Sequence, residues 1–277
     1  MSADEYASGP VWVCGGFVFF TAWDHLLRQM IPLSARNTNV QSWKWKNTAV
    51  SLVHSIITGC WSLLCFYEHP KLGEDLIKIY TRSSHMLVSF SVGYFMHDFL
   101  DMALHHRKRS SYELMVHHLC VIACFGLSVW TRMFVGYAVV ALFVEVNSIF
   151  LHIRQLFNIT GVGKKEPKYR LNSMLNIGTF VIFRIAVLGW MTRWLVIHKD
   201  DLSLAVYTLG SVGLAIIMVM SIVLFLRVCI ADFTKKAPKD SNMHHESNHK
   251  KAQECDDSMK LSSAATLLPN GTNIHLD

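Results

Sequence analysis

The segment LMVHHLCVIACFGLSVW, residues 114–130, places two adjacent histidines, His117 and His118, in a stretch that is otherwise almost entirely apolar. The flanking segments GYFMHDFLDM (93–102) and LFVEVNSIFLHIRQL (142–156) are also apolar runs interrupted by ionisable and polar residues. Such groups are costly in hydrocarbon, so they must face one another, water or a bound polar group. These three segments therefore indicate both the fold class and the candidate site.

Apolar segments recur along the whole chain, which is 52% hydrophobic and only 17% charged, against about 25% charged in a typical soluble domain. Seven are visible, at residues 11–30, 48–67, 84–104, 115–130, 133–153, 174–197 and 204–226. Most approach the roughly 20 residues that a spanning helix needs. The sequence therefore predicts an all-α, multi-pass transmembrane helical bundle of six to seven helices, six if the first segment is a cleaved signal peptide.

Two alternatives to this membrane bundle are disfavoured. A soluble helical protein needs a polar face on nearly every helix, and residues 204–226 contain no charged residue. A signal peptide has a basic start, whereas this chain begins with the acidic MSADEY. We therefore interpret residues 11–30 as an uncleaved first span, although Asp24 and Arg28 make its end polar.

The distribution of basic residues predicts the membrane topology. With the adjoining helix ends included, the loops after the first, third and fifth predicted spans carry 12 Lys and Arg residues, against 6 for the loops after the even-numbered spans. By the positive-inside rule, the former loops and the C-terminus face the cytoplasm. The net charge of +6 then reflects basic loops near anionic lipid, and no nucleic-acid partner is expected.

The regions outside the spans are interpreted from their composition. Residues 234–277 are polar, which is typical of a disordered tail; their cluster of His244, His245 and His249 is interpreted as solvated. The seven cysteines show no zinc-binding spacing, so no metal is expected. The segment SWKWKN (42–47) precedes the second span, and we predict that its rings lie at the membrane interface with its lysines directed toward lipid phosphate.

Helical spacing aligns the polar residues of the third predicted span. His97 and Asp101 are four residues apart and share a face, and Asp98 lies three residues before Asp101. His117 and His118 point about 100° apart on their own helix. We therefore expect one of the two histidines to face the centre of a polar seam.

The fifth and sixth predicted spans contribute further polar groups. Glu145, Ser148 and His152 follow an i, i+3, i+7 pattern and lie on one face. Arg184 lies deep in the sixth span, and a buried arginine requires a partner. Glu145 and Asp98 are its candidate carboxylates.

Two interpretations of these groups remain open. They either connect helices through hydrogen bonds worth about 0.6 kcal/mol each, or they converge on a polar pocket. Histidine titrates near neutral pH, and a histidine beside a carboxylate is the minimal general-base arrangement. We favour the pocket for the cluster as a whole, while for single residues such as His54 and Arg184 both interpretations stand.

Residues 43 to about 233 resemble the TLC domain that ceramide synthases and the TRAM translocon proteins share. The resemblance is carried by SWKWKN (42–47), VSLVHSIITGCWSLLC (50–65), FSVGYFMHDFLDM (90–102), YELMVHHL (112–119) and VEVNSIFLHIRQL (144–156). Within this family, the chain resembles most the calfacilitin-like branch, which is implicated in membrane fluidity. The chain then divides into an N-terminal segment with the first helix (1–42), a TLC domain (43–233) and a disordered cytoplasmic tail (234–277).

The resemblance implies chemistry on lipids. Ceramide synthases carry a His-His pair at the position of His117 and His118 and join a fatty acyl-CoA to a sphingoid amine. Their next helix carries His-Asp-x-x-Asp, whereas the corresponding run here is VEVNS (144–148), which keeps only the acid Glu145. A His-Asp-x-x-Asp string occurs instead at residues 97–101, before the histidine pair. These departures argue against ceramide synthesis.

The calfacilitin-like branch implies a different function, which is control of phospholipid acyl composition by limiting the incorporation of long-chain polyunsaturated fatty acids. The expected partners are membrane phospholipids or fatty acyl chains. The expected location is the plasma membrane, with the endoplasmic reticulum as the alternative. Two other functions remain open: an acyl-CoA-dependent lipid acyltransferase, and a non-enzymatic auxiliary subunit of a channel or translocon.

The candidate site follows from these considerations. The expected catalytic residues are His117, His118, Asp98 and Asp101, and the expected substrate-binding residues are His97, Glu145, Asn147, His152 and Arg184. One histidine of the pair would act as a general base that Asp98 or Asp101 orients, while Arg184 would balance Glu145. No cofactor is expected, and acyl-CoA is the co-substrate of the enzymatic alternative.

Overall fold

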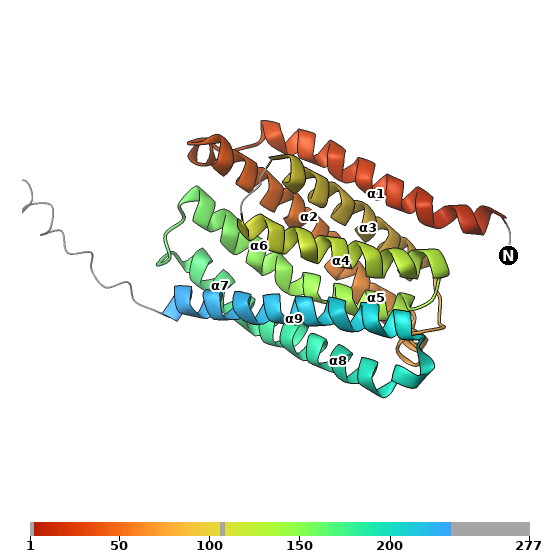
Figure 1. The fold of residues 1–277 in the computed structure, drawn as a ribbon. Helices are drawn as coiled ribbons and strands as arrows, with labels where there is room; N and C mark the ends of the chain where they lie inside the picture. Colours follow the sequence, from red (N-terminus) through yellow and green to blue (C-terminus); the bar gives the residue numbers. More distant parts are fainter. Residues whose placement is uncertain (1–2, 106–108, 234–277) are drawn as a thin grey trace, which may run out of the picture. The chain divides into compact units, whose positions relative to one another are not determined.

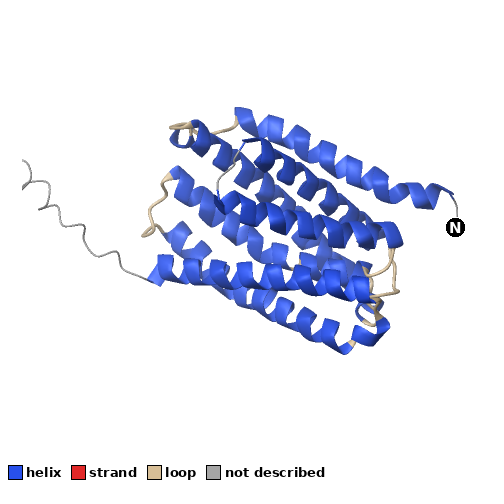
Figure 2. Cartoon of the chain, viewed as in Figure 1, coloured by secondary structure: helices blue, strands red, loops and turns tan. Residues whose placement is uncertain are grey.

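The computed structural model of the protein describes residues 3–105 and 109–233, and every regular element in these ranges is helical (Figures 1 and 2). The long elements are α1 (Ala3–Gln29), α2 (Asn39–Glu68), α3 (Arg82–His105), α4 (Arg109–Thr131), α5 (Val135–Leu142), α6 (Val144–Thr160), α7 (Pro167–Phe180), α8 (Val187–Ile197) and α9 (Leu204–Phe233). Short 3-10 turns lie at Leu33–Ala35, Pro70–Gly73 and Lys199–Asp201. The predicted tail at 234–277 lies outside the described residues.

These elements form seven helical runs, because α5 continues into α6, and α7 continues through a π-helical turn (Val181–Ala186) into α8. The predicted all-α membrane bundle is thereby confirmed. Five runs are long and apolar enough to cross a membrane: Asn39–Glu68, Tyr112–Thr131, Val135–Thr160, Pro167–Ile197 and Leu204–Asp232.

The helices α1 and α3 are not among those five runs, and α3 shows why a polar helix is tolerated here. It packs against α1, α2, α4 and α5, so its polar side chains face protein instead of lipid. Many of them are fully or almost fully buried: Ser84, His85, Ser89, Ser91, His97, Asp98 and Asp101. Burial among helices replaces the apolar surface that a lipid-facing span needs.

Successive runs alternate in direction, so each end of the bundle collects particular helix termini (Figure 1). One end of the bundle, on the left of Figure 1, is formed by the start of α2, the end of α3, the start of α4 and the end of α6; we call it the polar end. The opposite end is formed by the end of α4, the start of α5, the end of α8 and the start of α9; we call it the apolar end. The described residues up to Cys229 form one compact unit.

Two glycines let α1 and α3 touch backbone to backbone. A Cβ atom on Gly93 would lie 2.3 Å from the Val13 carbonyl oxygen and 2.6 Å from the Phe17 nitrogen, and one on Gly16 would lie 2.6 Å from the Phe90 oxygen. Small residues allow such close approach of helices in membranes. The first helix therefore packs tightly on the helix that carries Asp98 and Asp101.

Replacing Gly93 with alanine is expected to lower the free energy of unfolding by about 1–3 kcal/mol, because the added methyl group must push the α1 backbone away. Gly15→Ala is the matched control on α1, since a Cβ there meets nothing within 4 Å. Thermal unfolding of the detergent-purified protein measures the difference. Equal midpoints for the two variants would contradict the packing described above.

Candidate functional site

A cavity of about 1070 Å³ lies inside the compact unit, and its wall is formed by residues of α2 to α6, α8 and α9 and by Arg184 of the π-helical turn. On α4 its lining runs from Glu113 to Ser128, which corresponds to about 22 Å at the helical rise of 1.5 Å per residue. Polar side chains line it at the polar end and at mid-depth, whereas Leu202, Val206 and other apolar residues line it at the apolar end. The cavity therefore extends deep into the bundle and changes character along its length.

The histidine pair lies on the cavity wall, and His118 is held by a carboxylate. His118 Nε2 lies 3.3 Å from Asp98 Oδ2, and the two residues are only 5% and 2% exposed. Asn47 donates from Nδ2 to Asp98 Oδ1 over 2.5 Å. The contacts of Asp98 with Asn47 and with His118 therefore orient both the Asp98 carboxylate and the His118 imidazole.

His117 has different surroundings, although its ring centroid lies only 5.4 Å from that of His118. It also lines the cavity, so the pair does not divide into one seam residue and one outside residue as predicted. Within residues 3–105 and 109–233, no hydrogen bond to either of its ring nitrogens is formed. His118 Nδ1 has no partner in these ranges either, so His117 differs from His118 in having both ring nitrogens, and not one, available to a ligand.

Glu145 lies on the same wall but faces α2. Ser55 donates to Glu145 Oε2 over 2.6 Å, and His54 Nδ1 lies 3.9 Å from the same oxygen. The His54 ring stacks on Tyr94, with centroids 3.7 Å apart and planes at 12°. His54 therefore belongs to the lining of the cavity together with Glu145.

Arg184 does not form the predicted direct pair with Glu145. Its Nε donates to Asn147 Oδ1 over 3.1 Å, and its Nη2 donates to Ser148 Oγ over 2.8 Å. The Glu145 carboxylate is directed toward α2 instead, where it accepts a hydrogen bond from Ser55. Arg184 and Glu145 nevertheless both line the cavity.

Asn147 holds helices together and lies outside the cavity wall. It is fully buried, and its Nδ2 donates to the Asn176 carbonyl, to Asn176 Oδ1 and to Thr179 Oγ1, each over 3.1 Å. It thus links α6 to α7 and orients Arg184, which lies in the π-helical turn. Such turns are frequent at functional sites. His152, by contrast, lines the cavity as predicted from its spacing.

The structure separates His97 and Asp101 from the cavity wall. As predicted, they share a face of α3, but this face turns toward α1 and the start of α2. His97 contacts the ring of Phe17 edge-on at 6.0 Å, and Asp101 accepts a 2.8 Å hydrogen bond from Trp43 Nε1. Of the two aspartates, only Asp98 lines the cavity.

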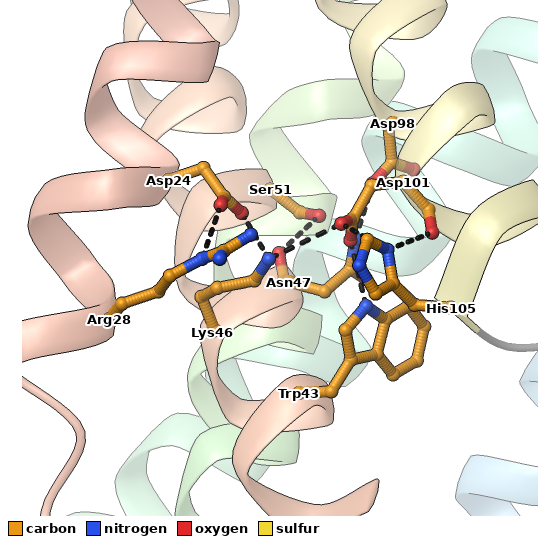
Figure 3. A network of polar contacts seen from close by, with 9 residues as sticks. All are labelled: Asp24, Arg28, Trp43, Lys46, Asn47, Ser51, Asp98, Asp101 and His105. Atoms are coloured by element: carbon orange, nitrogen blue, oxygen red, sulfur yellow. Dashed lines mark hydrogen bonds and ion pairs between the residues drawn. The ribbon is translucent and has the colours of Figure 1, made fainter. Parts of the chain in front are cut away.

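A second polar network connects α1, α2 and α3 at the polar end (Figure 3). Lys46 is only 3% exposed; its Nζ lies 2.5 Å from Asp24 Oδ1 and 3.3 Å from Asp101 Oδ1. Arg28 also pairs with Asp24, and His105 with Asp101, both at 3.1 Å. The predicted orientation of Lys46 toward lipid phosphate is therefore wrong, because two buried carboxylates bind it, whereas Lys44 is exposed.

The sequence analysis missed several residues of the site. Asn47 follows Lys46 directly and reaches Asp98, so adjacent residues of α2 serve two different aspartates. Asp24 offered a signal for Lys46, since a carboxylate inside an apolar helix requires a cation. Arg154 and Arg227 both line the cavity, and no local pattern pointed to either of them. Among the described residues, no group of three or more His, Cys, Asp or Glu is arranged to hold a metal ion.

Lys46→Met is expected to destabilise the protein by about 3–5 kcal/mol, because it leaves two buried carboxylates without their shared cation. Lys44→Met is the matched control. Adding Asp24→Asn and Asp101→Asn to Lys46→Met is expected to restore most of the lost stability, since the uncompensated charges are then gone. Thermal unfolding in detergent tests this, and an unaltered midpoint for Lys46→Met alone would refute the role of the ion pairs.

Comparison with known proteins agrees with the resemblance inferred from the sequence. Residues 44–230 match the family model described as TLC domain. The zebrafish (Danio rerio) TLC domain-containing protein 2 is 51% identical over 221 residues, covering 80% of this chain and 88% of that protein. Human TLC domain-containing protein 1 is 33% identical over 220 residues, covering 78% and 88%. With the all-helical membrane bundle, these matches show that the chain belongs to the TLC-domain family.

Proposed function

We propose that this protein binds an acyl amphiphile in its cavity and thereby regulates the acyl composition and fluidity of membrane phospholipids. In this proposal it limits the incorporation of long-chain polyunsaturated fatty acids. The observation that carries the proposal is the cavity of about 1070 Å³, which combines ionisable groups with an apolar section inside a membrane bundle. The plasma membrane is the proposed location, and the endoplasmic reticulum is the alternative.

The order of side chains along the cavity supports an amphiphilic ligand. Ligand pockets of roughly 300–1,000 Å³ bury most of a small molecule, so this cavity has room for a headgroup and an acyl chain. At mid-depth, His117, His152 and Arg184 offer hydrogen-bond donors and acceptors. A ligand's ester or thioester oxygens would lie at this level.

The section toward the apolar end suits a hydrocarbon chain. Leu188, Met191 and Trp194 form one face of α8 along the cavity. Tyr137 donates its hydroxyl to the Met191 carbonyl over 3.2 Å and packs its ring against Trp194, with centroids 5.1 Å apart. The hydroxyl of Tyr137 thus has its hydrogen-bond partner within the protein, and the Tyr137 ring contributes an apolar surface to the cavity wall.

A second candidate function is acyl transfer from acyl-CoA to a lysophospholipid, which the surroundings of the histidine pair favour. His117 would accept the proton of the acceptor hydroxyl as this oxygen attacks the thioester carbonyl. The acyl–sulfur bond then breaks, and the thiol of coenzyme A leaves with a proton. His118, held by Asp98, would position this site. The third function considered, an auxiliary subunit, has no need of such a cavity.

Filling the cavity tests the binding proposal. Gly210 lies on the cavity wall, and a Cβ there meets only the Leu195 side chain at 3.7 Å, so Gly210→Phe is expected to place its ring in the open space. We expect this variant to lose lipid that co-purifies with the wild type and to lose the wild-type effect on cellular phospholipid unsaturation. Mass spectrometry of bound and cellular lipids measures both.

The control for this experiment is Gly189→Phe, because Gly189 is exposed on α8 and a Cβ there meets nothing within 4 Å. This variant should retain both properties. An unchanged unsaturation profile in cells with and without the wild-type protein would count against the proposed function.

The catalytic candidate predicts turnover of acyl-CoA and lysophospholipid by the purified protein. His117→Ala is expected to lower that rate by roughly 10²–10⁴-fold, the usual contribution of a general base, whereas His25→Ala on the exposed face of α1 should not. Equal rates for the wild type and a His117→Ala, His118→Ala double variant would exclude catalysis by the pair. Bound lipid without any turnover would leave the non-enzymatic form of the proposal.

A further inference from the structure

The helices α4 and α9 run in opposite directions, and both line the cavity (Figure 1). They meet at Gly213 of α9, where a Cβ atom would lie 3.0 Å from Cys120 Sγ and 3.3 Å from Cys124 Sγ. Cys124 Sγ also lies 4.0 Å from the Leu209 carbonyl oxygen. We call these four residues the thiol contact. Because Gly213 has no side chain, the two helices lie close together at this level.

The exposure of the cavity lining changes on the polar side of the thiol contact. At the contact and toward the apolar end, the described lining residues of α4 and α9 are buried or half-buried. Toward the polar end, the exposed lining residues of the two helices are Glu113, Leu114, Val219, Val223 and Arg227. Val219 is 61% exposed and Val223 is 40% exposed. A residue that lines the cavity and is also exposed lies at a rim, so the cavity opens between α4 and α9 on this side. We call this the lateral opening.

The lateral opening reaches nearly to the depth of His117. Val219 follows Gly213 by six residues, which is about 9 Å toward the polar end at the helical rise. His117 precedes Cys120 by three residues, which is about 4.5 Å in the same direction because the helices are antiparallel. Val219 and His117 therefore differ by only about 4.5 Å in depth. A polar group that enters at the opening comes close to the level of His117 Nδ1, which has no hydrogen-bond partner among the described residues.

Lipid faces the lateral opening. The runs Tyr112–Thr131 and Leu204–Asp232 are both long and apolar enough to cross a membrane. Valine side chains that are exposed on such a run meet acyl chains, because the hydrocarbon core of a bilayer holds no water. The opening therefore connects the cavity with the acyl chains of one leaflet.

The opposite side of α9 is anchored to the rest of the bundle. The ring of Phe225 packs against that of Phe180 at the end of α7, with centroids 5.1 Å apart. Leu214 packs in a buried apolar cluster with Leu188 and Leu195 of α8. These contacts hold α9 on α7 and α8, so the side toward α4 is the one on which the cavity wall stays open.

This arrangement discriminates between classes of amphiphile. A one-chain ligand that arrives from water needs only the polar end of the cavity, where Gln155 and Asn158 of α6 are exposed lining residues. A phospholipid of the bilayer has two acyl chains joined at one headgroup. Through the lateral opening, one of these chains can enter while the other stays in the leaflet.

The cavity beyond the lateral opening is long enough for one acyl chain. Val206 and Val219 both line it, and the thirteen residues between these positions correspond to about 20 Å. The acyl chains of one leaflet span about half of the roughly 30 Å hydrocarbon core of a bilayer. One chain therefore fits between the opening and the apolar end.

We propose that the cavity takes up one acyl chain of a two-chain phospholipid through the lateral opening, while the second chain remains in the bilayer. The headgroup then stays at the polar end, and the ester of the inserted chain lies near the depth of His117. This inference rests on the proposed lipid-binding function, and it names the ligand class of the cavity and the route by which the ligand enters.

Photolabelling of the full-length protein in liposomes tests this inference. Two probes have the same diazirine-bearing acyl chain: phosphatidylcholine, which has two chains, and lysophosphatidylcholine, which has one. Labelling is measured at Leu188, Leu195 and Leu214, which line the cavity and are buried. Only a chain inside the cavity reaches these residues.

The test variant is Val219→Trp, Val223→Trp, which narrows the lateral opening. Its matched control is Val212→Trp, Ile222→Trp, because these residues of α9 are 51% and 47% exposed and lie outside the cavity wall. We expect both probes to label the wild type and the control. The test variant should lose most of its labelling by phosphatidylcholine and keep that by lysophosphatidylcholine, which still enters at the polar end. Its thermal unfolding midpoint should stay at the wild-type value.

Each other outcome contradicts a particular step. Phosphatidylcholine labelling of the folded test variant at the wild-type level would overturn entry through the lateral opening. Loss of both probes would contradict the placement of the two valines at the rim, since the substitutions would then have filled the cavity itself. Should the test variant unfold, Val219→Phe, Val223→Phe replaces it, with the same expected loss of phosphatidylcholine labelling.

The wild type alone separates failure of this inference from failure of the proposed function. If only lysophosphatidylcholine labels it, the two-chain ligand class is overturned while lipid binding stands. If neither probe labels the three leucines, the proposed function itself fails.

Discussion

The cost of an unpaired charge in hydrocarbon is the constraint on which this structure depends. A buried charged group needs a partner within the protein, because lipid offers none. Lys46 between Asp24 and Asp101 satisfies this requirement for three helices at once. The same requirement explains why α3, with its aspartates and serines, packs against four other helices and still belongs to a membrane bundle.

This constraint divides the polar groups into two sets with different consequences. In Figure 3, which also draws Asn47 and Asp98, the carboxylates of Asp24 and Asp101 are bound by cations, and Asp101 also by the indole of Trp43; these contacts connect α1, α2 and α3. On the cavity wall, Asp98 is bound by Asn47 and His118, and Nδ1 of the neighbouring His117 has no hydrogen-bond partner among the described residues. The first set holds helices in place, while the second leaves groups available for a ligand.

Consecutive residues of α2 belong to the two sets of polar groups, so the packing of this helix positions both sets. Lys46 and Asn47 are neighbours on α2, and they reach Asp101 and Asp98, which lie three residues apart on α3. The orientation of α2 against α3 therefore sets both contacts together. Any shift that breaks the ion pairs of Lys46 also moves the amide that holds Asp98. The packing of α1 through Gly93 and Gly16 is part of the same arrangement.

Apolar segments and helical spacing were enough to predict the seven helical runs, the shared face of His97 and Asp101, and a polar cavity around His117 and His118, because hydropathy and a 3.6-residue period are local properties. They did not predict which neighbour each face would meet. Only the tertiary structure turned Asp101 toward Lys46, Arg184 toward Asn147 and Ser148, and Arg227 toward the cavity wall shared with Arg154. The physical reason is that a partner across a helix interface depends on the rotation and depth of both helices, and neither quantity is encoded within one segment.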